Sequence, residues 1–116
     1  LLPLTKETEN ILNKDTLAYL PKNAYVINVA RGEHLVEENL IELIEAGHLA
    51  GASLDVFRQE PLPEDHPFWA HPQINITPHV ASITDPDSVV TQILENYDRL
   101  RKNEPLLHVV SPTKGY

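Results

Sequence analysis

The 116-residue sequence contains no cysteine. This absence excludes disulfide bonds, thiolate nucleophiles, zinc ribbons and iron–sulfur ligation, and a cytoplasmic location becomes the expectation. Basic residues are also few, because 9 Lys and Arg face 17 Asp and Glu and give a formal net charge of −8. Phosphate contacts need clustered cations, so we expect no nucleic-acid partner. The sequence also lacks any run of about 18 apolar residues, so we expect no membrane-spanning helix.

The first residues of the chain, Leu1 to Thr5, include no initiator methionine and lack the charged and apolar regions of a signal peptide. Hydrophobic residues form 41% of the sequence, which is enough for a core in a chain of about one domain's length. We therefore expect a single folded unit that is part of a longer protein.

Three apolar segments are predicted to be β-strands: residues 24–29, 49–57 and 74–77. Segment 24–29 is a nearly continuous apolar run with β-branched residues, which is typical of a parallel strand covered on both faces. We therefore expect it at the centre of the sheet. Pro78 ends the third strand, because proline cannot extend a ladder of backbone hydrogen bonds.

Helical patterns lie before, between and after these segments. Asn13 can cap a short helix over 15–20, and apolar residues at helical spacing predict a second helix over 36–47. Thr84 is expected to cap a final helix that extends to Leu100. This alternation of strands and helices predicts the α/β class, with a parallel sheet and right-handed crossovers.

Charged and titratable residues accompany the carboxyl end of each predicted strand: Arg31 for the first, Asp55 and Glu60 for the second, and His79 for the third. In an open parallel sheet, ligands bind at the carboxyl ends of the strands, so these side chains are expected at one edge. An arginine can hold a carboxylate, a histidine can donate a proton near neutral pH, and a glutamate can orient the imidazole. Arg31, His79 and Glu60 therefore predict acid catalysis on an anionic substrate.

Each of these four residues also has a purely structural interpretation. Arg31 could pair with a surface glutamate, and Asp55 could cap a turn. Glu60 could be an ordinary loop carboxylate, and His79 could be a satisfied core histidine. The positions of Arg31 and His79, directly after apolar strands, favour the functional interpretation for both.

The remaining histidines and the aromatic loop are interpreted as structural. His66 and His71 flank Trp69, but prolines interrupt their spacing, so we expect no metal site. Trp69 and Phe68 are expected to pack, although a loop aromatic near the sheet edge could close a pocket. Three further histidines are interpreted as surface residues: His34, His48 and His108.

Four motifs occur together: residues 3–8 (PLTKET), 28–32 (NVARG), 54–57 with 60–61 (LDVF and EP), and 77–81 (TPHVA). In this order and spacing they make the chain resemble the carboxyl-terminal part of the D-isomer-specific 2-hydroxyacid dehydrogenases, over essentially its whole length. Within that family the chain is most similar to the glyoxylate/hydroxypyruvate reductases, through residues 67–72, residues 79–84 and the terminal Gly115-Tyr116.

The resemblance implies an α/β, Rossmann-like nucleotide-binding domain. Residues 1–104 would be its carboxyl-terminal portion with the terminal helix, and residues 105–116 would be a tail. The resemblance also implies that Arg31 binds the carboxylate and carbonyl oxygens of a 2-keto acid. His79 would protonate the carbonyl oxygen as hydride arrives, and Glu60 would pair with His79.

The implied cofactor is NADPH or NADH, and the similarity to the reductases favours NADPH. Asp55 would bind the nicotinamide carboxamide. Four residues would line the nicotinamide: Ala30, Arg31, His79 and Ala81. The glycine-rich turn that binds the pyrophosphate in this family has no counterpart in these 116 residues. We therefore expect the chain by itself to be inactive and to bind NAD(P)H weakly.

The function that the resemblance implies is reduction of glyoxylate or hydroxypyruvate to the 2-hydroxy acid, and the implied assembly is a homodimer. Two alternatives stay open. One is another D-2-hydroxyacid dehydrogenase, such as phosphoglycerate dehydrogenase, and the other is a non-catalytic, NAD-sensing corepressor with the same fold.

Overall fold

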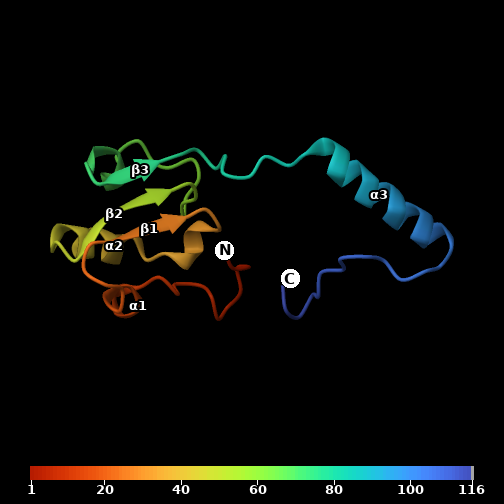
Figure 1. The fold of residues 1–116 in the computed structure, drawn as a ribbon, viewed down its shortest axis with the longest axis horizontal. Helices are drawn as coiled ribbons and strands as arrows, with labels where there is room; N and C mark the ends of the chain where they lie inside the picture. The colour runs from red at the N-terminus through yellow and green to blue at the C-terminus, as the bar shows by residue number, and fades with distance from the viewer. Residues whose placement is uncertain (116) are drawn as a thin grey trace. The chain divides into compact units, whose positions relative to one another are not determined.

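The computed structural model describes residues 1–115, and Figure 1 shows how its elements follow one another along the chain. The chain forms two compact units, Leu1–Ala81 and Ser82–Tyr116. Tyr116, the last residue of the predicted terminal motif and tail, lies outside the described residues. The division predicted at residues 104 and 105 stays a prediction.

The first unit contains a three-stranded parallel sheet in the order β1-β2-β3, which confirms the predicted α/β class (Figure 1). The strands are β1 (Ala24–Asn28), β2 (Leu49–Leu54) and β3 (Ile74–Ile76). The second strand ends at Leu54 rather than at the predicted Phe57. Its last three predicted residues belong to the loop that carries the site described below.

The prediction that residues 24–29 lie at the centre of the sheet is wrong for this chain, because β2 is central and β1 is an edge strand. One face of β1 is buried through Val26 and Asn28. On the other face Tyr25 is 45% exposed and Ile27 is 66% exposed. The continuous apolar run indicated that both faces of this strand can be buried, but within residues 1–115 only one of them is.

Two α-helices belong to the first unit. Helix α1 (Lys14–Ala18) begins at Asn13, whose side chain accepts hydrogen bonds from the backbone of Asp15 and Thr16 in a capping box. The predicted cap is therefore confirmed, although the helix ends before residue 20. Helix α2 (Glu37–Glu45) packs against β2, as its predicted apolar spacing required.

The core lies between α2, the sheet and the short 3-10 helix η2 (Pro67–Ala70). Its most deeply buried large side chains are Leu17, Leu35, Leu40, Ile44, Leu49, Leu54 and Phe68. Each such side chain contributes about 1.5–3 kcal/mol through the hydrophobic effect. His34 was expected at the surface but is only 3% exposed. The amino-terminal residues pack against it, with the carbonyl oxygen of Pro3 3.4 Å from Nε2 of His34.

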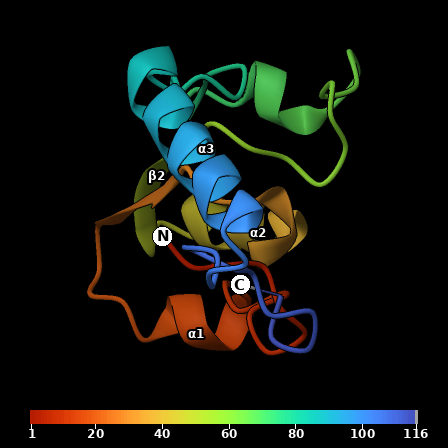
Figure 2. The same ribbon diagram turned by 90° about the vertical axis from the view of Figure 1, so that its right-hand side faces the viewer.

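The second unit begins at Ser82 and contains α3 (Pro86–Arg101), which Figure 2 shows as one uninterrupted helix. The cap is Asp85 and not the predicted Thr84. Pro86 occupies the first turn and favours an extended conformation for the residue before it, which makes Asp85 the cap. No helix within residues 1–115 is both long and apolar enough to cross a bilayer.

Candidate active site

The three strands run parallel, with Asn28, Leu54 and Ile76 side by side at their carboxyl ends. The segments that follow these residues therefore leave the sheet at one edge, where open parallel sheets bind ligands. Arg31 follows β1 and Asp55 follows β2 at this edge. His79 follows β3 there, as the sequence predicted.

The segment after β1 is shaped by Asn28, which is only 3% exposed. Its side-chain nitrogen donates to the carbonyl of Arg31 at 3.0 Å, and its side-chain oxygen accepts from the backbone of Ala30 at 3.2 Å. No role was predicted for Asn28, although an asparagine at the end of an apolar strand is a common turn signal. The Arg31 side chain is exposed, and one of its nitrogens donates to the carbonyl of Ala30 at 2.6 Å.

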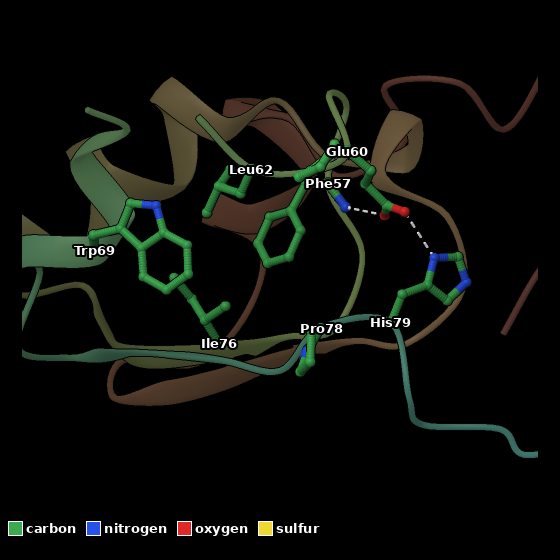
Figure 3. Close-up of a pocket in the computed structure, with 8 residues that line it drawn as sticks. Phe57, Glu60, Leu62, Trp69, Ile76, Pro78 and His79 are labelled. Carbon is green, nitrogen blue, oxygen red and sulfur yellow. Dashed lines mark hydrogen bonds and ion pairs between the residues drawn. The ribbon is translucent and has the colours of Figure 1, made fainter. Parts of the chain in front are cut away.

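Glu60 and His79 form an ion pair at this edge, which Figure 3 shows as a dashed line. Oε2 of Glu60 lies 2.8 Å from Nδ1 of His79, and Oε1 accepts from the backbone nitrogen of Phe57 at 2.9 Å. In Figure 3 the second ring nitrogen of His79 lies on the side away from Glu60. Glu60 thus orients the imidazole by one nitrogen and leaves the other directed outward.

The hydrogen bond from His79 and then that from the backbone of Phe57 lower the pKa of Glu60 below its ordinary value. Glu60 is consequently a carboxylate throughout the neutral range. Glu60 therefore presents a negative charge to Nδ1 of His79.

His79 has a backbone φ of 53°, in the left-handed region that residues with a side chain rarely adopt. Asp55 holds it there, because the Asp55 carbonyl accepts from the backbone nitrogen of His79 at 2.9 Å. The Asp55 carboxylate accepts from the backbone nitrogens of Val80 and Ala81, each at 2.9 Å, and from the hydroxyl of Thr77. Asp55 therefore anchors the turn that presents the histidine.

The Asp55 side chain is buried, with the residue only 2% exposed. This burial raises the pKa of Asp55, but the hydrogen bonds from Thr77, Val80 and Ala81 and the nearby His79 lower it, and the net pKa lies below its ordinary value. The turn-anchoring interpretation of Asp55 thus has direct structural support. The part played by Thr77 was missed, because its partner comes from another strand.

A cavity of about 480 Å³ adjoins the Glu60–His79 pair (Figure 3). It is lined by Phe57, Glu60, Pro61, Leu62, Trp69, Ile76, Pro78 and His79. Trp69 forms the wall opposite His79 in Figure 3, and its indole nitrogen donates to the carbonyl of Pro63 at 2.8 Å. Of the two aromatic residues in η2, Phe68 is buried in the core and Trp69 borders this cavity.

A second cavity, of about 210 Å³, lies at the end of β1. Ala30, Val29 and His34 are among its lining residues. Ala30 therefore borders an open space at the same edge of the sheet. The lining is mostly apolar.

Two other histidines, His66 and His71, have protein partners of their own. His66 pairs with Glu37 at 3.4 Å, and His71 accepts from the backbone of Gln73 at 3.2 Å. In the part of the chain that the structure describes, no three histidine or acidic side chains are grouped so as to hold a metal ion.

Comparison with known proteins relates this geometry to a family. Residues 1–81 match the model of the D-isomer specific 2-hydroxyacid dehydrogenase, NAD binding domain. The whole chain is 52% identical to the glyoxylate/hydroxypyruvate reductase A of Photorhabdus laumondii and 49% identical to that of Klebsiella pneumoniae. The chain spans 37% of the length of each of these curated relatives.

Solved structures show the same similarity. A D-isomer specific 2-hydroxyacid dehydrogenase from Xanthobacter autotrophicus, in complex with NADPH and MES, matches all of this chain at 47% identity and a TM-score of 0.95. An NADPH-dependent glyoxylate/hydroxypyruvate reductase from Sinorhizobium meliloti, in complex with NADP and sulfate, matches all of it at 40% identity and a TM-score of 0.91. The chain covers 48% of the first structure and 38% of the second.

Proposed function

Because the chain belongs to the D-isomer specific 2-hydroxyacid dehydrogenase family, we propose that the intact protein reduces glyoxylate or hydroxypyruvate to the corresponding 2-hydroxy acid, with NADPH as the hydride donor. The observation that carries this proposal is the Glu60–His79 pair at 2.8 Å, at the same sheet edge as Arg31. The choice of substrate and of NADPH is supported by relatives that bear this activity in their names.

In this proposal Arg31 binds the substrate carboxylate, since its guanidinium is exposed and keeps donors free for two oxygens. His79 donates a proton to the carbonyl oxygen from the ring nitrogen that faces away from Glu60. Glu60 orients the imidazole through its contact with Nδ1. Proton donation and carboxylate binding therefore come from two different strand ends.

The residues at the edge fit a nicotinamide ring, which when bound supplies the hydride. Ala30 has a small side chain and borders a mostly apolar cavity, which suits a flat ring. Ala81, also small, lies in the turn held by Asp55. An ionised carboxylate has about four acceptor positions, and Asp55 uses three of them within the protein. In this proposal the carboxamide of the ring donates to the remaining position.

A homodimer and a cytoplasmic location belong to the same proposal and rest on the family resemblance. Sedimentation of the intact protein tests the homodimer, and fractionation of the cells that produce the protein tests the cytoplasmic location. A monomer at micromolar concentration would contradict the proposed assembly without affecting the catalytic roles.

The proposed activity is tested by following NADPH absorbance when glyoxylate, hydroxypyruvate or a bulkier 2-keto acid is added to the intact protein. We expect glyoxylate or hydroxypyruvate to be reduced most efficiently. Arg31→Ala should raise KM much more than it lowers kcat, because a bidentate partner of the carboxylate is lost. Saturable NADPH binding without turnover of any 2-keto acid would refute the proposed reductase activity and would favour a nucleotide-sensing function.

A further inference from the structure

Three segments of the first unit meet at the side chain of Arg58. Its Nε donates to the carbonyl of Leu35 at 2.9 Å, and a terminal nitrogen donates to the carbonyl of Glu33 at 3.1 Å. The same terminal nitrogen donates to the side-chain oxygen of Asn10. Arg58 thus joins the segment after β2 to the segment after β1 and to residues near the amino terminus.

The backbones of two of these segments are also in close contact. A Cβ atom on Gly32 would lie 2.0 Å from the carbonyl carbon of Phe57 and 2.5 Å from the backbone nitrogen of Arg58. A residue with a side chain therefore cannot replace Gly32 unless the two segments separate. Arg58, which is exposed, holds the same junction from the solvent side.

Two parts of the proposed active site lie next to the contact between Gly32 and the backbone of Phe57 and Arg58, which we call the junction. Arg31 directly precedes Gly32, and Glu60 lies just beyond Arg58 in the loop. Glu60 is tied back to the junction by the backbone nitrogen of Phe57 at 2.9 Å, and it reaches His79 at 2.8 Å. The contacts around Arg58 therefore set the distance between Arg31, which binds the carboxylate, and the Glu60–His79 pair, which donates the proton.

We propose that Arg58 is a positioning residue, which sets the spacing between Arg31 and the Glu60–His79 pair. The inference rests on the proposed function. The planar guanidinium contacts three oxygens from two segments at once, whereas a lysine would offer a single ammonium group. A misplacement of reacting groups by about 1 Å can cost up to about 10²-fold in rate.

The test compares Arg58→Ala, Arg58→Lys and the control Lys22→Ala in the intact protein, with NADPH and glyoxylate. Lys22 is an exposed cation just before the amino end of β1, far along the strand from the site. Arg58→Ala should lower kcat/KM by about 10- to 10²-fold, with a raised KM as a substantial part of the loss. Arg58→Lys should be intermediate, and Lys22→Ala should match the wild type.

A merely structural role would reduce the amount of active enzyme, which lowers kcat and leaves KM unchanged. That result would overturn the proposal, and so would an Arg58→Ala protein that is indistinguishable from Lys22→Ala.

Amide hydrogen exchange separates this inference from the proposed function. Arg58→Ala should speed exchange in residues 33–36, whose backbone the arginine holds through the carbonyls of Glu33 and Leu35. If the wild type reduces no 2-keto acid, the proposed function fails, and exchange decides whether Arg58 fixes the Arg31 segment. Unchanged exchange there would show that it does not.

Discussion

Helices α2 and α3 carry the same kind of apolar stripe but meet different surroundings. Helix α2 buries Leu40 and Ile44 against the sheet of its unit, at 0% and 2% exposure. None of the sixteen residues of α3 is buried among residues 1–115, and Leu94 is 58% exposed. Apolar periodicity therefore predicts where a helix forms, but not whether a second surface covers it.

The two units are consequently stabilised in different ways. The first has a core drawn from both helices, the sheet and η2. In the second, α3 depends on local contacts: the Asp85 cap, the Glu95–Arg99 pair at 3.3 Å, and hydrogen bonds between Asn96 and Leu107. A side-chain pair four residues apart on a helix, such as Glu95–Arg99, contributes only about 0.2–0.5 kcal/mol to helix stability.

The largest expected effect lies in the unit that has the core. His79→Ala in the intact protein should lower kcat for 2-keto acid reduction by about 10²–10⁴-fold, because the proton donor is lost. KM should change much less, in contrast to Arg31→Ala. Steady-state kinetics with purified, folded protein measure both constants, and an unchanged kcat would remove His79 from the mechanism.

Removal of a buried contact from α2 should have the next largest effect. Leu40→Ala should lower the free energy of unfolding of the 116-residue chain by about 2–5 kcal/mol, since it leaves a cavity in a packed core. Urea denaturation followed by circular dichroism measures the change. A loss below about 0.5 kcal/mol would mean that the core of the first unit contributes little to its stability.

The pH dependence of stability should also be concentrated in the first unit, through Asp55 and Glu60. Their pKa values in the folded chain lie below the ordinary values. The unfolded chain therefore binds protons first as the pH falls, and the stabilisation is complete above about pH 5 and lost progressively below about pH 4.

Asp55→Asn should weaken this acid dependence, because an amide does not titrate over that range. Urea midpoints of the wild type and the variant, measured from neutral pH down to about pH 2, test the sign. An equally steep decline in both proteins would mean that Asp55 does not contribute to the acid dependence.

The smallest effect is expected in α3. Leu94→Ala should change the free energy of unfolding of the 116-residue chain by no more than about 0.5 kcal/mol, because an exposed side chain loses little on truncation. Leu94 and Leu40 undergo the same substitution, so together they measure the contrast between the two helices. An equal loss at both positions would contradict it.

Much of the candidate site could be predicted from sequence because parallel strands bring their carboxyl ends together. Knowing three strands was enough to place Arg31, Asp55 and His79 at one edge. The partners of Asp55 could not be predicted, since its carboxylate accepts from a turn after a different strand. Arg58 gave no signal, because its acceptors lie in distant segments that only folding brings near.

The sequence by itself determined the main helices and strands, the Asn13 cap of α1 and the parallel direction of the strands, because these depend on periodicity and on contacts between near neighbours. The tertiary structure alone decided that β1 is an edge strand with Tyr25 and Ile27 exposed, that His34 is buried, and that Asp55 anchors the histidine turn. Burial and hydrogen-bond partners depend on which distant residues lie opposite, and local patterns carry no record of that pairing.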